Sequence, residues 1–146
     1  VPIPRSNVHR LQGELPPEEA AAQYEDALRA VFGDVRVPTF DLILLGLGED
    51  GHTASLFPDT EALGVRDRWV VPNYVERLEK WRLTLTLPVL NAAEHATFVV
   101  AGERKAEILE AVLTTSADAP TYPAQHVHPD EGRLIWLVDA EAAGVA

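Results

Sequence analysis

A continuous apolar run that passes directly into a glycine-rich loop is the feature of this sequence that most constrains its fold. The run covers residues 42–45, and the glycines that follow it are Gly46, Gly48 and Gly51. Such a run is typical of a strand that is covered on both faces, which is the usual state of a strand in a parallel sheet. We therefore expect an α/β fold with a mainly parallel sheet flanked by helices, in which this strand is central.

The glycine-rich loop predicts a binding site at the carboxyl end of that strand. Glycine permits positive φ angles and lets backbone N–H groups approach an anion or a developing oxyanion, so Gly46, Gly48 and Gly51 are candidate binding residues. His52 follows Gly51 directly. Open α/β sheets bind ligands where their strands end, and imidazole exchanges protons near neutral pH. His52 is therefore the candidate proton-transfer group.

The same three glycines also spell G-x-G-x-x-G, the fingerprint of a dinucleotide-binding turn. That fingerprint requires a long helix after its third glycine, and Pro58 would end such a helix early. It also requires an acidic residue at the end of a second strand, but the apolar pair at residues 70–71 is followed by Pro72 and Asn73. The context therefore disfavours nucleotide binding.

The composition is that of an ordinary globular protein. The chain has 146 residues, of which 47% are hydrophobic and 24% are charged, so we expect a single domain spanning residues 1–146. No apolar run approaches the length that a membrane helix needs. The sequence contains no cysteine. This excludes a disulfide framework, a thiolate nucleophile and a cysteine-based zinc site, and it is compatible with a cytoplasmic location.

The formal net charge of −11 limits the partners that this chain is expected to have. Nucleic acids and acidic membranes favour basic surfaces, so neither is an expected partner. The same net charge repels a phosphorylated small molecule at long range. A phosphate ligand therefore requires a local group of arginine or lysine side chains.

The first helix is predicted to begin at Pro17 and to end just before Gly33. Prolines and glutamates at its start and a glycine after its end are typical helix boundary signals. The helical spacing of its apolar residues predicts a core-facing side that contains Tyr24, Leu28, Val31 and Phe32. The opposite, solvated side is predicted to contain Glu25, Asp26 and Arg29.

Strand and helix patterns alternate along the rest of the chain. Arg82 opens an alternating pattern in which Leu83, Leu85 and Leu87 face one side and Arg82, Thr84 and Thr86 face the other, which predicts a half-buried strand with a polar face. The other predicted segments are short strands at residues 8–11 and 69–71, an exposed polar segment at 74–80, a short helix at 88–94, a strand at 96–101, a helix after residue 102, a loop at 116–129 and a strand at 133–139.

Lys105 lies where the helix after Gly102 is predicted to begin. Arg104 and Lys105 occupy its first turn, where the helix dipole disfavours cations, and a charge in this position often has an outside partner. Free N–H groups and an ammonium group at a junction of strand, glycine and helix would suit a phosphate. The alternative is that Lys105 projects into water.

His126 and His128 are the candidates for a metal site. They lie two residues apart, and on a strand this spacing would place both rings on one face. No third ligand is evident nearby. No metal site is therefore predicted.

Three spaced motifs in this sequence resemble those of the 6-phosphogluconolactonases. The first is G-x-G-x-D-G-H-T-A-S-L-F-P at residues 46–58, the second is R-x-T-L-T-x-x-x-L-N-x-A beginning at Arg82, and the third is G-x-x-K-A beginning at Gly102. The resemblance implies the fold of the glucosamine-6-phosphate deaminases and isomerases. It also implies hydrolysis of a phosphorylated sugar lactone without a cofactor or a metal.

The resemblance assigns a role to each candidate residue. His52 is expected to act as the general base and Asp50 to orient it or to hold the loop. Arg82 and Lys105 are expected to bind the sugar phosphate. The N–H groups between Gly46 and Gly51 are expected to stabilise the oxyanion.

Two alternative functions remain open. The related deaminases share the strand and the Asp-Gly-His segment but continue to an Asn-Glu-Pro segment with a catalytic glutamate, where this chain has Leu56, Phe57 and Pro58. The lactonase branch therefore fits better than an amino sugar phosphate isomerase or deaminase. The second alternative is a fragment that is inactive or binds sugar phosphate weakly.

The fragment alternative arises because lactonases of the resembled family carry further sequence ahead of this region. That sequence includes a Gly-Gly-Ser-Thr-Pro loop and a Gly-Asp-Glu-Arg segment, and neither motif occurs here. We therefore expect this chain to correspond to the carboxyl-terminal portion of a lactonase domain, with an exposed sheet edge. The oligomeric state is left open.

Overall fold

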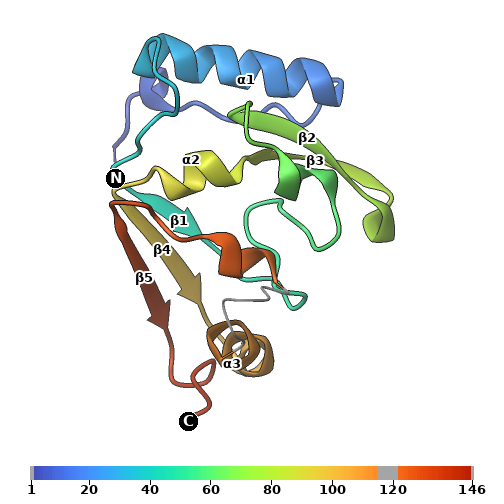
Figure 1. The fold of residues 1–146 in the computed structure, drawn as a ribbon, viewed down its shortest axis with the longest axis vertical. Helices are drawn as coiled ribbons and strands as arrows, with labels where there is room; N and C mark the ends of the chain where they lie inside the picture. Colours follow the sequence, from blue (N-terminus) through green and yellow to red (C-terminus); the bar gives the residue numbers. More distant parts are fainter. Residues whose placement is uncertain (1, 115–121, 146) are drawn as a thin grey trace.

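The computed structural model describes residues 2–114 and 122–145 and contains two β-sheets. Three parallel strands form one sheet in the order β1-β4-β5, and their bounds are β1 (Ile43–Leu45), β4 (His95–Val100) and β5 (Arg133–Val138). The second sheet is the antiparallel hairpin of β2 (Val70–Val75) and β3 (Lys80–Leu85). The helices are α1 (Pro17–Phe32), α2 (Leu87–Asn91) and α3 (Ala106–Thr114). This arrangement confirms the predicted α/β class with helices beside a parallel sheet (Figure 1).

Helix α1 has the predicted boundaries and packs on the hairpin (Figure 1). Gly33 ends the helix at a positive φ of 76°, and its N–H donates to the carbonyl of Arg29 over 2.8 Å. The predicted faces of α1 are wrong at two positions. Val31 is 64% exposed, whereas Glu25, predicted to be solvated, is only 6% exposed.

Glu25 is buried because its carboxylate accepts hydrogen bonds from several donors at once. The guanidinium groups of Arg29 and Arg68 donate to it over 2.9 and 3.0 Å. The backbone N–H groups of Trp69 and Val70, where β2 begins, donate to it over 3.1 and 3.2 Å. Burial alone would raise the pKa of this carboxyl, but the hydrogen bonds outweigh burial and hold the pKa below its ordinary value. One carboxylate thus links α1 to the start of β2.

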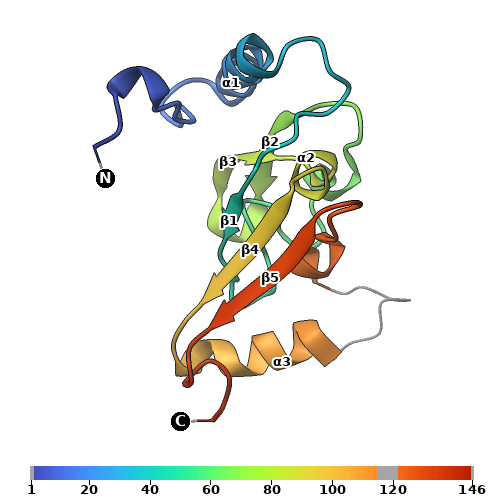
Figure 2. The same cartoon turned by 90° about the vertical axis from the view of Figure 1, so that its left-hand side faces the viewer.

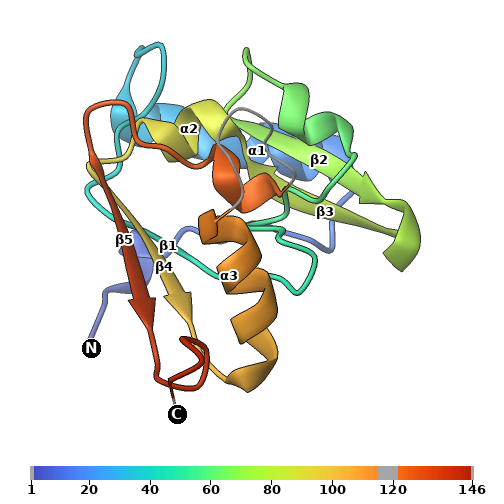
Figure 3. The same cartoon turned by 60° about the horizontal axis from the view of Figure 1, so that its bottom comes forward.

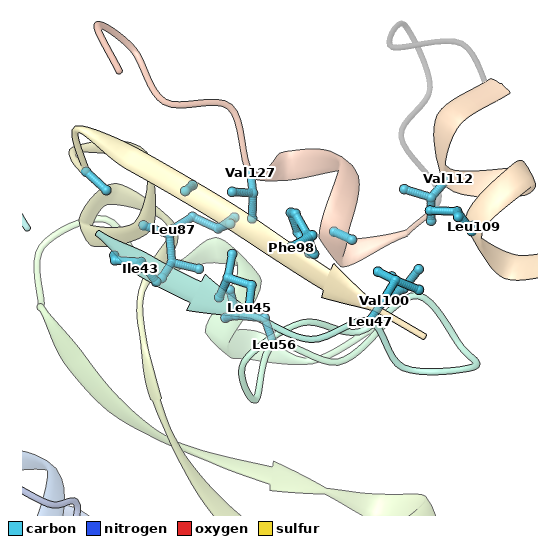
Figure 4. Close-up of a cluster of buried hydrophobic side chains, with 14 of the residues drawn as sticks. Ile43, Leu45, Leu47, Leu56, Leu87, Phe98, Val100, Leu109, Val112 and Val127 are labelled. Carbon is cyan, nitrogen blue, oxygen red and sulfur yellow. The ribbon is translucent and has the colours of Figure 1, made fainter. Parts of the chain in front are cut away.

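The parallel sheet is covered on one face only, so the prediction that the first strand is covered on both faces is wrong. Ile43 and Leu45 are buried among side chains of β4, α2 and α3 (Figure 4). Leu42 and Leu44 are 53% and 65% exposed on the other side. We call this other side the open face. Its exposed apolar residues are Leu42, Leu44, Val99, Ile135 and Leu137, and no helix lies in front of it in Figure 2.

The hairpin is longer than predicted, and its threonine side is buried. Residues 74–80, predicted to be exposed and polar, contain the end of β2, the short 3₁₀ turn η3 (Glu76–Leu78) and the first residue of β3. Thr84 and Thr86 are 1% and 0% exposed. Their hydroxyls are satisfied by carbonyl oxygens, those of Leu85 and Arg68 respectively. A polar strand face is therefore compatible with burial here, because its hydroxyl groups find backbone partners.

Three further predictions are corrected. Residues 8–11 form no strand and follow the 3₁₀ turn η1 (Arg5–Asn7). The described part of the predicted loop at 116–129 contains the 3₁₀ turn η5 (Pro123–His126), and residues 116–121 lie outside the described residues. The helix predicted directly after Gly102 begins with the 3₁₀ turn η4 (Glu103–Lys105), and α3 follows at Ala106.

Candidate active site

The glycine-rich loop after β1 folds back on itself and lies between the hairpin and α3 (Figures 1 and 3). The N–H of Gly48 donates to the carbonyl of His52 over 2.8 Å, and the N–H of Gly51 donates to the carbonyl of Gly48 over 3.0 Å. The buried hydroxyl of Thr53 donates to the carbonyl of Gly46 over 2.9 Å. Two of the loop N–H groups predicted to face an anion are therefore used inside the loop.

Glycine is required in this loop mainly because side chains pack closely against its backbone. Of the three loop glycines, only Gly51 adopts the positive φ that glycine permits, at 75°. A Cβ atom at Gly48 would lie 2.0 Å from Nδ1 of His52, and one at Gly51 would lie 2.5 Å from the ring of Tyr122. Gly46 has open space around its Cα. Gly48 and Gly51 thus allow aromatic rings to approach the loop.

His52 is held by a carboxylate and by an aromatic ring. Its Nδ1 lies 2.5 Å from Oδ1 of Asp50, and its ring stacks on Phe57 with centroids 4.1 Å apart. Burial raises the pKa of the partly buried Asp50, but hydrogen bonds from His52, its charge and a backbone hydrogen bond together hold this pKa below its ordinary value, which favours the carboxylate. A carboxylate at Nδ1 favours the tautomer that carries its proton there and leaves Nε2 as a proton acceptor. This geometry is that of an oriented general base.

Arg77 completes this group, and sequence reasoning missed it. It lies in η3, 27 residues from Asp50, and its Nη2 forms an ion pair with Oδ2 of Asp50. Its guanidinium carbon also lies 5.2 Å from the centroid of the Phe57 ring. The only available signal was a basic residue in a segment that the pattern assigned to solvated surface.

A cleft of about 540 Å³ brings His52 and Lys105 together. It is lined by apolar residues of β1 and the hairpin, and its lining also includes Gly46, Gly48 and Thr84. Lys105, at the end of η4, also lines the cleft. Gly51 and Asp50 are not among the lining residues, and Asp50 acts from behind His52.

The junction before Lys105 differs from the phosphate site that was predicted there. The N–H of Gly102 points at the carboxylate of Asp139, 3.0 and 3.1 Å from its two oxygens. This N–H is therefore occupied by an anion of the protein itself. The positive group that the junction offers to the cleft is the Lys105 side chain.

The side chain of Arg82 lies on the face of the hairpin that contacts the segment following the glycine-rich loop. It pairs across the hairpin with Asn73, whose amide donates to the carbonyl of Ser55 over 2.8 Å. Thr84, two residues along β3, accepts a hydrogen bond from the N–H of Ser55 over 3.2 Å. Side chains two apart on a strand share a face, so Arg82 points toward the loop side. It is exposed and is not among the residues that line the cleft.

In the described parts of the chain, no group of three or more histidine, aspartate or glutamate side chains could hold a metal ion. His126 and His128 are instead anchored through their backbones. The amide of Asn91 donates to the carbonyl of His126 over 3.0 Å and accepts from the N–H of His128 over 2.9 Å. Among the residues that the structure describes, no helix is both long and apolar enough to cross a bilayer.

Comparison with known proteins gives a consistent result. The family model described as glucosamine-6-phosphate isomerases/6-phosphogluconolactonase matches residues 1–136. The 6-phosphogluconolactonase of Homo sapiens is 46% identical over 144 residues, which are 98% of this chain and 55% of that protein. The 6-phosphogluconolactonase of Synechocystis sp. is 44% identical over 146 residues, covering 97% of this chain and 59% of that protein.

Solved structures agree with the sequence relatives. A crystal structure of devB protein superposes with a TM-score of 0.89 at 37% identity, covering 99% of this chain and 60% of that one. The 6-phosphogluconolactonase from Thermotoga maritima gives a TM-score of 0.74 at 33% identity, covering 93% of this chain and 57% of that one. The present chain thus spans a little more than half the length of the relatives it matches.

Proposed function

This chain belongs to the family of glucosamine-6-phosphate isomerases and 6-phosphogluconolactonases, and from that premise we propose that it hydrolyses 6-phosphoglucono-1,5-lactone to 6-phosphogluconate. The reaction is a step of the pentose phosphate pathway. The observation that carries the proposal is the contact between His52 and Asp50 at the edge of a cleft that also contains Lys105. A general base and a phosphate-binding cation are the two groups that this reaction needs at one site.

In the proposed mechanism, His52 activates water. Its Nε2 accepts a proton from a water molecule while the water oxygen forms a bond to C1 of the lactone. The tetrahedral intermediate then breaks the bond between C1 and the ring oxygen, and the imidazolium returns its proton to that oxygen. The products are a carboxylic acid at C1, which ionises, and a hydroxyl at the former ring oxygen. Asp50 keeps Nδ1 protonated throughout the cycle.

The oxyanion of the intermediate needs hydrogen-bond donors. The N–H groups of Gly48 and Gly51 already donate within the loop. We therefore assign oxyanion stabilisation to the other N–H groups between Gly46 and Gly51. The two engaged N–H groups keep the loop backbone rigid.

The phosphate is assigned to Lys105, with Arg82 as a second ligand at the hairpin. The net charge of −11 repels a phosphorylated sugar at long range, so cations near the cleft must reverse the local field. Lys105 lines the cleft, and Arg82 starts from the hairpin side that contacts the loop. Holding the phosphate would place C1 of the substrate against the activated water.

An amino sugar phosphate isomerase or deaminase is the less favoured function. Leu56 and Phe57 stand where that branch carries its catalytic glutamate, and they are 0% and 5% exposed. Phe57 supports the His52 ring instead of supplying a carboxylate. We place the lactonase in the cytoplasm, because a phosphorylated sugar is an intracellular metabolite and the chain uses no cysteine.

The test is the rate of 6-phosphogluconolactone opening with and without the protein, after subtraction of spontaneous hydrolysis. We expect acceleration that falls by about 100-fold or more in His52→Ala, with little change in KM. His9→Ala removes an exposed histidine that does not line the cleft and serves as the matched control.

Three outcomes would contradict the proposal in different ways. Near-normal turnover in His52→Ala would remove His52 from the role of base. Conversion of glucosamine 6-phosphate would favour the isomerase branch. No acceleration by the unmodified chain would favour the alternative of an inactive or weakly binding fragment.

A further inference from the structure

Arg77 contacts both groups that hold His52 but does not line the cleft. Its guanidinium forms the ion pair with Oδ2 of Asp50 and lies over the ring of Phe57. Asp50 and Phe57 in turn contact the imidazole through Oδ1 and through ring stacking. Arg77 is therefore placed behind the base and outside the set of residues that would touch a ligand in the cleft.

The hairpin that carries Arg77 is fixed to the glycine-rich loop at other points. Asn73 of β2 donates to the carbonyl of Ser55 and to the hydroxyl of Thr60, over 2.8 and 3.0 Å. Thr84 of β3 accepts from the N–H of Ser55. Since both strands are anchored to the loop, the turn between them is held at a defined place relative to Asp50. Arg77 thus projects from a supported position although its side chain is 55% exposed.

We propose that Arg77 is a positioning residue of this site, which acts through Asp50 to hold His52 as a general base. The inference rests on the role proposed above for His52. Both oxygens of the Asp50 carboxylate are engaged: Oδ2 by Arg77, and Oδ1 by Nδ1 and the backbone N–H of His52. With both oxygens engaged, the carboxylate cannot rotate away from Nδ1 without breaking a charge-assisted hydrogen bond.

Arg77 also changes the electrostatic balance at the imidazole. The charged groups around His52 are Asp50 on its own loop, Arg77 on the hairpin and Lys105, which lines the same cleft; Glu49 of the loop is exposed and pairs with the exposed Arg104. Asp50 favours the protonated imidazolium, and Arg77 and Lys105 oppose it. Loss of Arg77 leaves the Asp50 charge less compensated, so the imidazole should retain its proton to higher pH.

The experiment compares Arg77→Gln with Lys80→Gln in the full chain. Lys80 is an exposed residue at the start of β3, so its substitution removes one positive charge from the same hairpin without touching Asp50. The first readout is the NMR titration midpoint of the His52 ring, assigned by its loss in His52→Ala. We expect the midpoint to rise by about half a pH unit in Arg77→Gln, since an exposed charge is partly screened, and to stay unchanged in Lys80→Gln.

The second readout is lactone hydrolysis. We expect Arg77→Gln to lower kcat by about tenfold at neutral pH with KM unchanged, because a displaced base slows the chemical step and leaves substrate affinity intact. The acid limb of the kcat profile should move to higher pH with the ring midpoint. Arg77→Lys, which keeps the charge, should restore most of the midpoint.

An unchanged His52 midpoint in Arg77→Gln, or an equal shift in Lys80→Gln, would overturn the proposal. A rise in KM with kcat unchanged would also overturn it, because Arg77 would then be a substrate ligand. The NMR titration needs no turnover. If the chain opens no lactone, the proposed function fails while the titration still decides the role of Arg77.

Discussion

Gly48 lies so close to the His52 ring that no side chain fits between them. A Cβ at this position would be 2.0 Å from Nδ1 of His52, 2.2 Å from its Cε1 and 2.7 Å from Oδ1 of Asp50. These three atoms belong to the contact between His52, the proposed general base, and Asp50. The backbone here is not in the left-handed region, so the need for glycine comes from close approach alone.

We therefore expect Gly48→Ala to damage the site more than the fold. The added methyl must push the imidazole off the Asp50 carboxylate, which should lower kcat by about 10-fold to 100-fold, as expected for a base displaced by about 1 Å. Overpacking should cost about 1–3 kcal/mol of unfolding free energy. Steady-state kinetics and urea denaturation measure the two effects. Gly64→Ala is the control, since a Cβ at Gly64 meets nothing within 4 Å; equal effects of both substitutions would contradict the argument.

The sequence was sufficient to find Asp50 and His52, which belong to one local motif. It was not sufficient to find Arg77, which only the folded hairpin brings to Asp50. Asp50 and His52 are two residues apart, so the loop alone brings them into contact. That Asp50 orients His52 or holds the loop stays a prediction. Arg77 reaches Asp50 only because β2 and β3 form a hairpin over the loop. The glycines were predicted from conformational freedom, whereas the structure uses Gly48 for side-chain contact.

At the scale of elements, the contact between α1 and β2 depends on a buried carboxylate. Glu25 receives hydrogen bonds from Arg29 on its own helix, from Arg68 and from the backbone at the start of β2. These donors lose their shared partner if the charge is removed, and unpaired buried donors are costly. The free energy of unfolding should thus depend on the ionisation of this one group.

We expect Glu25→Gln to lower the unfolding free energy by about 1–3 kcal/mol at pH 7. The pKa of Glu25 is held below its ordinary value of 4.5, so the folded state favours the carboxylate. Its contribution is therefore complete above about pH 4.5 and is lost as the pH falls through the lowered value. The difference between the two proteins should shrink below that pH. Urea denaturation at pH 7 and at successively lower pH measures it.

The control for this prediction is Asp26→Asn, which removes the same charge from the neighbouring, exposed position of α1. It should change the unfolding free energy by less than about 0.5 kcal/mol. A pH-independent difference in Glu25→Gln would mean that packing, and not charge, is what the glutamate supplies.

The boundaries of helices and strands were easier to predict than the environments of their side chains. The proline, glutamate and glycine signals located α1 correctly. The assignment of its faces failed at Glu25 because a charged residue at a helical position shows no sign of the arginines and free N–H groups that will meet it. The same limit applies to Thr84 and Thr86, whose hydroxyl groups are buried against backbone carbonyls.

At the scale of the whole molecule, the open face of the sheet leaves apolar side chains exposed to solvent. Parallel sheets are normally covered on both faces, yet no helix lies in front of this face in Figure 2. Leu44 and Leu137 on the open face are 65% and 55% exposed. Strand β1 also lies at an edge, because β4 is its only partner in the sheet as described. An exposed apolar face beside an unpaired edge favours association with other protein surfaces.

We therefore expect this chain to self-associate at high concentration through the open face. The double variant Leu44→Lys with Leu137→Lys should shift sedimentation profiles toward the monomer and reduce binding of a hydrophobic dye, because lysine is poorly tolerated at a contact between apolar faces. Both substitutions are on exposed positions, so the fold should persist.

The matched control places the same charges elsewhere. Val31 on α1 and Leu113 on α3 are also exposed, at 64% and 55%, and their double replacement by lysine changes the net charge from −11 to −9, as does the first pair. If association depends on the open face, only the first pair should reduce it. Equal reduction by both pairs would show that net charge governs association, and monomeric behaviour of the unmodified chain at high concentration would show that the open face is tolerated in water.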